Sequence, residues 1–206
     1  NHIHDLGKGM LSDMGGVSLL GKQPGTVVCG NVIHDVSSKN YGGWALYTDE
    51  GSSYMTLEDN ICYNCSDNCY HQHYGSYNLI RNNIFAFGGE QIFRISRLED
   101  HVSLLLENNI FYSAGAPMYG LQEGHITEGK VPSRNNLFFD TTEKYRFFGD
   151  HDIAYMRENG MEDGSIIADP GFADAEHYDF TLTDDSPAYA IGFQKLDPSD
   201  VGVRGE

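Results

Sequence analysis

Asparagine residues followed by short apolar runs recur along the first two thirds of the chain. They are Asn1, Asn31, Asn60, Asn83, Asn109 and Asn136. The intervals between them are 30, 29, 23, 26 and 27 residues, which is too regular for chance. One turn of a parallel β-helix needs about this length, because each coil holds about three short strands and stacks on the next at ~4.8 Å. The pattern therefore predicts stacked coils.

Positions at fixed offsets from these asparagines form columns of one chemical character. The column two residues after each asparagine is apolar: Ile3, Ile33, Cys62, Phe85, Phe111 and Phe138. So is the column three residues before it: Val28, Leu57, Ile80 and Leu106. Two residues before it the charge alternates from coil to coil, through Glu58, Arg81, Glu107 and Arg134. Such columns suit in-register stacking, so we predict an all-β fold, a parallel β-helix of about six coils.

The asparagine column has a further implication. A stacked asparagine can bond through its side-chain amide to the equivalent residue of the next coil. We therefore expect a buried ladder of side-chain hydrogen bonds along the helix axis.

The regular pattern ends near residue 139. Residues 1–139 are expected to form the coils, and residues 140–206 an irregular acidic excursion and a C-terminal capping segment of the same domain. Between 140 and 168 a solvated acidic loop is the favoured interpretation, and a structural calcium ion is the alternative. The alternating residues of Asp179-Phe-Thr-Leu predict a final strand that covers the exposed end of the coil stack.

Charge and hydropathy narrow the classes of partner. The 206 residues include 13 Lys and Arg against 30 Asp and Glu, a formal charge of −17. This balance argues against nucleic acid and anionic membranes as partners, and no apolar run reaches the roughly 18 residues of a membrane span. The chain starts at Asn1, inside the repeat and without a signal peptide, so we expect a fragment or processed piece of a secreted or periplasmic protein. An open first coil predicts a monomer or weak end-to-end association.

The cysteines have no firm metal signature. Cys62-x-x-Cys65 followed by Cys69 lacks the second ligand pair of a zinc site. Cys62 stands in an apolar column, which predicts a core thiol. A disulfide between Cys65 and Cys69 is left open.

The stretch from Gly42 to Gly51 combines aromatic and acidic residues. Trp44, the only tryptophan of the chain, stands five residues before the adjacent acids Asp49 and Glu50. An aromatic surface beside paired carboxylates suits sugar binding and glycosidic acid and base chemistry. A packed strand end followed by a solvated acidic turn is the alternative.

Aligning Gly51 with Gly75 brings residues of two coils together. Tyr47 then lies beside His71 and Asp49 beside His73, and residues two apart in a strand share a face. The next coil supplies Arg94 and Arg97 near this level, and His101 follows in a loop that could fold over the face.

The preceding coil adds one more acid. Aligning Gly15 and Gly16 with Gly42 and Gly43 places Asp13 just before the level of Trp44. A capping role for Asp13 in the turn before Gly15 is the alternative.

These residues suggest roles in glycosidic bond cleavage, which needs one carboxylic acid and a second carboxylate. Asp13 and Asp49 are the first candidates and Glu50 is the third. The candidate substrate-binding residues are Trp44, Tyr47, His71, His73, Arg94, Arg97 and His101. His71 and His73 could instead ligate a metal, but no fourth ligand is evident, so we favour hydrogen bonding and predict no metal and no cofactor. His4 and His34 occupy equivalent repeat positions and are expected to form a stacked structural pair.

Several segments resemble one enzyme family. They are Leu11-Ser-Asp-Met-Gly-Gly, Pro24-Gly-Thr-Val, Asn31-Val-Ile-His-Asp, Tyr41-Gly-Gly-Trp, Tyr47-Thr-Asp-Glu-Gly, His71-Gln-His-Tyr-Gly and Arg81-Asn-Asn-Ile-Phe-Ala-Phe. The chain is similar to secreted bacterial right-handed parallel β-helix proteins, and most closely to glycoside hydrolase family 141, over most of residues 1 to 112. This resemblance implies hydrolysis of plant cell-wall glycan in a lateral groove, by a xylanase-like or α-L-fucosidase-like enzyme.

Two other functions compete with this hypothesis. Many β-helices are polysaccharide lyases, which need a base and a cation to neutralise the carboxylate of a uronate polymer. Arg94, Arg97 and His73 could serve, although the acidic patch argues against it. The third hypothesis is a non-catalytic glycan-binding coil stack.

Overall fold

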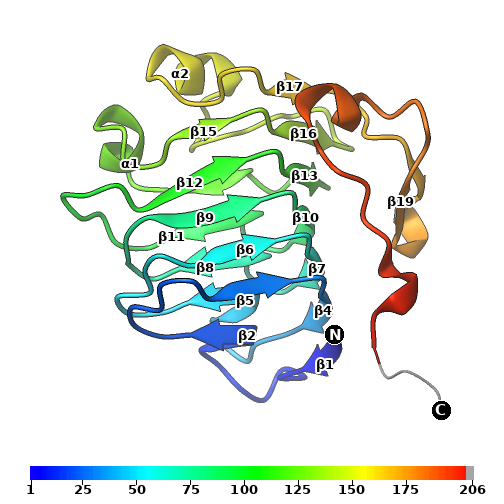
Figure 1. Cartoon of the computed structure of the whole chain (residues 1–206), viewed down its shortest axis with the longest axis horizontal. Coiled ribbons are helices and arrows are strands. Elements are labelled where there is room, and N and C mark those ends of the chain that lie inside the picture. Colours follow the sequence, from blue (N-terminus) through cyan, green and yellow to red (C-terminus); the bar gives the residue numbers. More distant parts are fainter. Residues whose placement is uncertain (203–206) are drawn as a thin grey trace.

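The computed structural model describes residues 1–202 and contains a stack of coils built from three parallel sheets (Figure 1). Each of the first five coils contributes one strand to each sheet, in the order sheet 1, sheet 2, sheet 3, and the sixth begins with a strand of sheet 1. Six coils begin at the six repeat asparagines, as the spacing predicts. The chain is thus an all-β right-handed parallel β-helix of about six turns with few helices.

The strands of the three sheets are short and paired in parallel. Sheet 1 holds β1 (His2–Leu6), β4 (Val32–Val36), β7 (Ile61–Cys65), β10 (Ile84–Gly88), β13 (Ile110–Ser113), β16 (Leu137–Asp140) and β17 (Ile166–Ile167). Sheet 2 holds β2 (Met14–Leu19), β5 (Gly43–Thr48), β8 (Tyr70–Gln72), β11 (Phe93–Ile95) and β14 (Tyr119–Gly120). Sheet 3 holds β3 (Val27–Cys29), β6 (Thr56–Glu58), β9 (Asn78–Arg81), β12 (Leu104–Glu107) and β15 (Ser133–Arg134).

The asparagine column forms the expected ladder at the corner between sheet 3 and sheet 1. Each side-chain amide nitrogen donates to the side-chain oxygen of the next asparagine. From Asn1 to Asn136 these nitrogen–oxygen distances are 2.8, 2.8, 3.0, 3.0 and 3.2 Å. The ladder satisfies amide groups that are buried between coils, where an unpaired polar group would cost about 1–3 kcal/mol.

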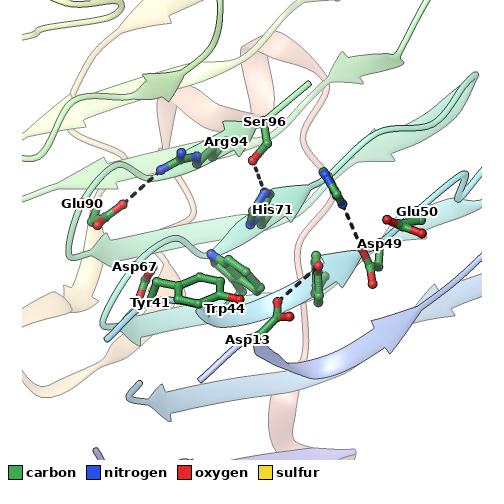
Figure 2. A pocket seen from close by; sticks show the side chains of 12 residues that line it. Asp13, Tyr41, Trp44, Asp49, Glu50, Asp67, His71, Glu90, Arg94 and Ser96 are labelled. Atoms are coloured by element: carbon green, nitrogen blue, oxygen red, sulfur yellow. Dashed lines mark hydrogen bonds and ion pairs between the residues drawn. The ribbon is translucent and has the colours of Figure 1, made fainter. Parts of the chain in front are cut away.

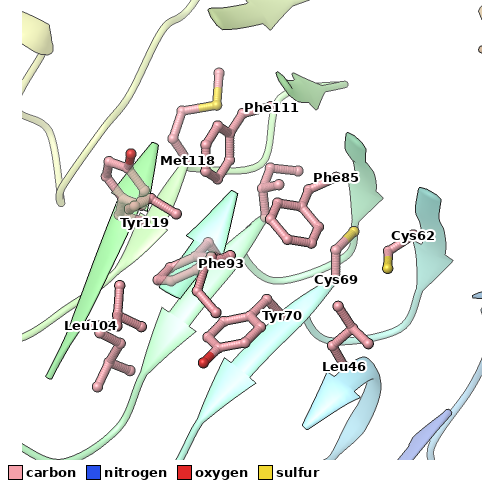
Figure 3. Packing of buried hydrophobic residues seen from close by; sticks show 14 of the residues in the cluster. Leu46, Cys62, Cys69, Tyr70, Phe85, Phe93, Leu104, Phe111, Met118 and Tyr119 are labelled. Carbon is pink, nitrogen blue, oxygen red and sulfur yellow. The ribbon is translucent and has the colours of Figure 1, made fainter. Parts of the chain in front are cut away.

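The apolar columns fill the interior of the stack (Figure 3). The column after the asparagines is in register through all six coils, and Phe111 and Phe138 stack with their ring centroids 4.9 Å apart. The column from Val28 to Leu106 is also in register. The periodic apolar positions of the sequence are therefore the core.

The charged column pairs across coils in sheet 3. Arg81 Nε lies 2.6 Å from a carboxylate oxygen of Glu58, and Arg134 lies 2.7 Å from Glu107. These groups are partly exposed, so each pair contributes at most about 1 kcal/mol. They favour the correct register more than they stabilise the fold.

Cys62 is a buried core thiol, as predicted. Cys65 and Cys69 are also buried, and all four cysteines of the chain are free in the structure. Burial raises the pKa of Cys69, whose Sγ donates to the carbonyl of Ala86 at 3.1 Å. These thiols pack as small apolar groups.

Residues 140–168 cover the last coil of the stack instead of forming only a solvated loop. This segment includes helix α2 (Ile153–Glu158), and it buries Phe147, Met156 and Met161 in the core. Most of its acidic residues are exposed, but Glu162 is fully buried. The expectation for this segment is thus correct for its surface and wrong for its apolar residues.

Glu162 ends the asparagine ladder. Its carboxylate accepts hydrogen bonds from the side chains of Tyr119 at 2.6 Å, Ser165 at 2.7 Å and Asn136 at 3.1 Å. Three donors compensate a buried carboxylate that would otherwise be costly.

The C-terminal segment does not cover the coil end, so that prediction is wrong. Strands β18 (Phe172–Asp174) and β19 (Asp179–Leu182) form an antiparallel hairpin, and the short turns η1 (Ala175–His177), η2 (Pro187–Ile191) and η3 (Pro198–Asp200) complete the segment. Figure 1 shows it running alongside sheet 1, past the strands of successive coils. Residues 203–206 of the predicted segment lie outside the described residues.

The outer face of sheet 1 explains this placement. From Asn60 onward, the residues directly after the asparagines and those two positions later are apolar. They pack in one cluster with the C-terminal segment: Ile61, Tyr63, Ile84, Ala86, Ile110, Tyr112, Leu137, Phe180, Leu182, Ala188, Ile191 and Phe193. A strand that is apolar on both faces must be covered on both. Among residues 1–202 no segment covers sheet 2 in this way, so its outer face stays open to solvent.

Candidate functional site

The open face of sheet 2 carries a cavity of about 570 Å³ (Figure 2). Side chains from the first four coils line it: Asp13, Tyr41, Trp44, Tyr47, Asp49, Glu50, Asp67, His71, His73, Glu90, Arg94 and Ser96. Eight of the ten residues predicted for the site lie here. The structure therefore brings most of the candidate residues to one surface.

An irregularity in β5 brings Trp44 and Tyr47 to the same face. Ala45 and Leu46 both belong to the interior core, so the strand breaks strict alternation between them. Trp44 and Tyr47, three residues apart, consequently both line the cavity. Alternation resumes afterwards, and Asp49 follows Tyr47 on the same side.

Tyr47 lies between two acidic residues of adjacent coils. Its hydroxyl oxygen is 3.4 Å from Oδ1 of Asp13 and also hydrogen-bonds to Asp49. Burial, the hydrogen bond to Asp49 and the charge of Asp13 together raise the pKa of Tyr47 well above its ordinary value. The hydroxyl therefore stays protonated at neutral pH.

Asp49 is held in its ionised form. Burial acts to raise its pKa, but hydrogen bonds from the Tyr47 hydroxyl, the Glu50 backbone N–H and His73 outweigh it, so the pKa lies below the ordinary value. His73 Nδ1 is 3.2 Å from Asp49 Oδ1. The predicted pairing of Asp49 with His73 across two coils is present, as is that of Tyr47 with His71.

Trp44 is buried in the wall of the cavity and does not present an exposed ring face for a sugar to stack on. Only 3% of it is exposed, and its indole N–H donates to the side-chain oxygen of Asn68 at 3.1 Å. Its ring packs against Tyr47 and His71, with centroids 4.3 and 4.1 Å apart. The aromatic surface that solvent reaches belongs to Tyr41, which is 54% exposed and meets Trp44 edge-on.

His71 is a buried, neutral imidazole. Burial, followed by the charges of Arg94 and His73, lowers its pKa to about 3. Its Nε2 lies 2.6 Å from the Ser96 hydroxyl, whereas its Nδ1 has no hydrogen-bond partner among the described residues. This Nδ1 is a buried polar atom without a partner among the described residues, an uncommon state for a polar group.

Asp67 anchors the turn before Trp44, and sequence reasoning missed it. Its carboxylate accepts the backbone N–H groups of Gly42 at 2.7 Å and Gly43 at 3.0 Å. Gly42 has φ +83°, and a Cβ there would lie 2.6 Å from the Cα of Asp13. Asp67 thus fixes a glycine turn against which Asp13 is seated.

The alignment of the first two coils differs from the prediction by two residues. Gly15 pairs with Trp44, and Met14 pairs with Gly43. Because side chains in a strand alternate with a period of two, this error leaves the face unchanged. Asp13 still reaches the cavity, beside the Tyr41–Gly42 turn.

Arg94 is level with His71, and its guanidinium lies 3.2 Å from Glu90. Arg97 and His101 do not line the cavity. The Arg97 guanidinium lies over the ring of Tyr74, 4.7 Å from its centroid, and His101 Nε2 contacts the Gly75 carbonyl at 3.2 Å. Both lie where the chain turns away from sheet 2.

Within residues 1–202, no group of three or more His, Cys, Asp or Glu side chains is arranged to hold a metal ion. No helix in this part of the chain combines the length and apolar character needed to cross a membrane.

Comparison with protein families gave one match. The family described as right handed beta helix region matches residues 1–140. No curated protein and no solved structure matched the chain.

Proposed function

Because the chain belongs to the right-handed β-helix family, whose fold is common among polysaccharide-active enzymes, we propose that it hydrolyses glycosidic bonds in the open cavity on sheet 2. The observation that carries this proposal is the Tyr47 hydroxyl held between Asp13 and Asp49. Two acids from adjacent coils on one lateral surface provide the pair that glycoside hydrolysis requires.

The environment of each acid suggests its role. Asp49, with its lowered pKa, acts as the carboxylate that attacks the anomeric carbon or activates water. Tyr47 has a single hydroxyl proton and cannot donate to both acids at once. Its hydroxyl donates to Oδ1 of Asp13 at 3.4 Å and also lies beside Asp49, so it positions both acids, and Asp13, the acid not assigned as nucleophile or base, is the proposed general acid. Glu50, at the cavity edge, is the reserve candidate.

The charge of the cavity selects the substrate class. Five carboxylates line it, and its one arginine, Arg94, is paired with Glu90. Such a surface repels uronate polymers, so an uncharged stretch of plant cell-wall glycan is the proposed substrate, of xylan or fucosylated type. The same argument disfavours the lyase hypothesis, since the described lining offers no unpaired cation to neutralise a uronate.

The finer assignment, membership of glycoside hydrolase family 141 and action outside the cell, is part of this proposal. It rests on the sequence resemblance around Asp13 and Asp49. The geometry adds that both segments face the same cavity.

Product analysis tests the proposal. The full chain is incubated with xylan, fucosylated glycans and polygalacturonate, and products are identified by mass spectrometry. Saturated oligosaccharides or free sugar from the uncharged glycans, absent with the Asp49→Asn variant and retained with the matched exposed control Asp150→Asn, are expected. Unsaturated products from polygalacturonate would identify a lyase. Binding without any product would identify a non-catalytic coil stack.

A further inference from the structure

Two histidines meet on the outer face of sheet 1, on strands β1 and β4. The Nε2 atoms of His2 and His34 are 2.8 Å apart. This face of the first coils is separate from the cavity on sheet 2, and the proposed glycan chemistry does not use these residues.

The orientation of His34 is fixed on several sides. Its Nδ1 lies 2.7 Å from the Asp35 carboxylate, and its ring stacks nearly parallel between His4 and Tyr63, with centroids 5.1 and 4.6 Å away. Because Nδ1 carries the proton that Asp35 accepts, Nε2 of His34 has a free lone pair. A carboxylate on the far nitrogen is also how proteins orient metal-binding imidazoles.

His2 completes the pair. Its side chain is exposed, and its Nε2 atom lies against that of His34. Without a metal, His2 Nε2–H donates to the lone pair of His34. If its proton moves to Nδ1, both Nε2 lone pairs become available without net proton release.

We propose that His2 and His34 bind a divalent transition-metal ion of the kind that accepts two neighbouring imidazoles, Ni²⁺ or Cu²⁺, with water in the remaining positions. Two nitrogens 2.8 Å apart, each at about 2.1 Å from one ion, subtend roughly 85° at that ion. This angle suits adjacent positions of an octahedral or square-planar ion better than the tetrahedral shell of zinc. His4, whose Nδ1 lies 2.7 Å from Asp5, stacks beside the pair as a support.

Binding would join β1, the edge strand of sheet 1, to β4. An ion that binds only the folded state stabilises it by RT ln(1 + c/Kd), where c is the free metal concentration, so the melting temperature rises with that concentration. The measurable signature is therefore a melting temperature that depends on the metal concentration.

Isothermal titration calorimetry with Ni²⁺ tests this site in the full chain. We expect one equivalent bound by the native chain, a more than about tenfold weaker affinity in His34→Ala and in His2→Ala, and a smaller loss in Asp35→Asn. His177→Ala is the matched control, because His177 also pairs with an aspartate, Asp174, at 2.9 Å but is exposed and has no second imidazole partner in the described structure. Its affinity should equal that of the native chain.

Thermal melts separate binding from folding. Ni²⁺ is expected to raise the melting temperature of the native chain and of His177→Ala but not of His2→Ala, whose exposed side chain can be removed without disturbing the core. Unchanged affinity in both His2→Ala and His34→Ala would overturn the proposal. Loss of binding only in His73→Ala would overturn it too, by placing the ion in the sheet 2 cavity.

Discussion

The outer faces of sheet 1 and sheet 2 belong to the same coils, but one is covered by the chain and the other is open to solvent. On sheet 1 the outward residues from Ile61 onward are apolar and the C-terminal hairpin covers them. On sheet 2 the outward residues are acidic and aromatic, and they line an open cavity. The coil stack provides equivalent faces, so the outward residues alone decide which face becomes structural and which remains available for a ligand.

The largest expected effect on stability comes from disrupting the packing between sheet 1 and the C-terminal hairpin. Phe180 on β19 is 6% exposed and packs against Tyr63 and Phe172, with centroids 5.1 and 5.1 Å away. Phe180→Ala should lower the free energy of unfolding by about 3–5 kcal/mol in urea denaturation. Tyr41→Ala on the open face should change it by no more than about 0.5 kcal/mol. Equal losses would refute the contrast between the faces.

Glu162, at the end of the asparagine ladder, is fully buried and belongs to neither outer face, so replacing it tests the interior of the stack. Glu162→Ala leaves Tyr119 and Asn136 without their buried acceptor, so we expect a loss of about 2–3 kcal/mol in the free energy of unfolding. Glu162→Gln keeps an acceptor oxygen and should lose less. Equal stability of the two variants would mean that the buried donors of Tyr119 and Asn136 do not depend on an acceptor at position 162.

Tyr47→Phe tests how the open face controls the ionisation of Asp49. Losing the hydroxyl removes one of the hydrogen bonds that lower the pKa of Asp49, so that pKa should rise toward its ordinary value. The proposed reaction needs ionised Asp49, so activity is lost as the pH falls through this pKa. The acidic limb of the kcat/KM profile should therefore move to higher pH, and the maximum should fall roughly tenfold.

His71→Gln provides the comparison for that profile. His71, whose pKa is lowered by burial to about 3, is not among the groups that lower the pKa of Asp49. This variant should alter substrate binding without moving the acidic limb. A limb that stays fixed in Tyr47→Phe would contradict the role given to Tyr47.

The smallest effect is expected on sheet 3, whose outer face carries the charged column. Arg81→Ala removes the partly exposed pair with Glu58 and should cost less than about 1 kcal/mol in thermal or urea unfolding. High salt should reduce the difference further. A larger loss that salt does not change would mean that Arg81 contributes through packing.

The sequence was sufficient for the coils because stacking repeats the same physical demand at each turn. The asparagine amides and the apolar column must align, so their spacing reveals the register directly. Gly51 and Gly75 extended this register into sheet 2 and correctly paired Tyr47 with His71. The glycine pairs at 15–16 and 42–43 misaligned by two residues, because glycine has no side chain to distinguish one position from the next.

The features that sequence reasoning missed lie outside the repeated columns. Asp67 and Tyr41 stand at corners between strands, where coils differ in length and no column identifies them. Arg97 and His101 were placed near the cavity by proximity in sequence, but the chain turns away after β11. The consecutive apolar residues of Ile110-Phe-Tyr did signal a strand covered on both faces, and they could have located the C-terminal hairpin.

The most direct test of the central claim is hydrolysis in ¹⁸O-labelled water, on an uncharged xylan oligosaccharide, by the native chain, Asp13→Asn, Asp49→Asn and Asp150→Asn. The account predicts one ¹⁸O atom in each new reducing end for the native chain and Asp150→Asn, and rates lowered at least about 10³-fold in the other two variants. Products without ¹⁸O, or full activity in both Asp13→Asn and Asp49→Asn, would contradict it.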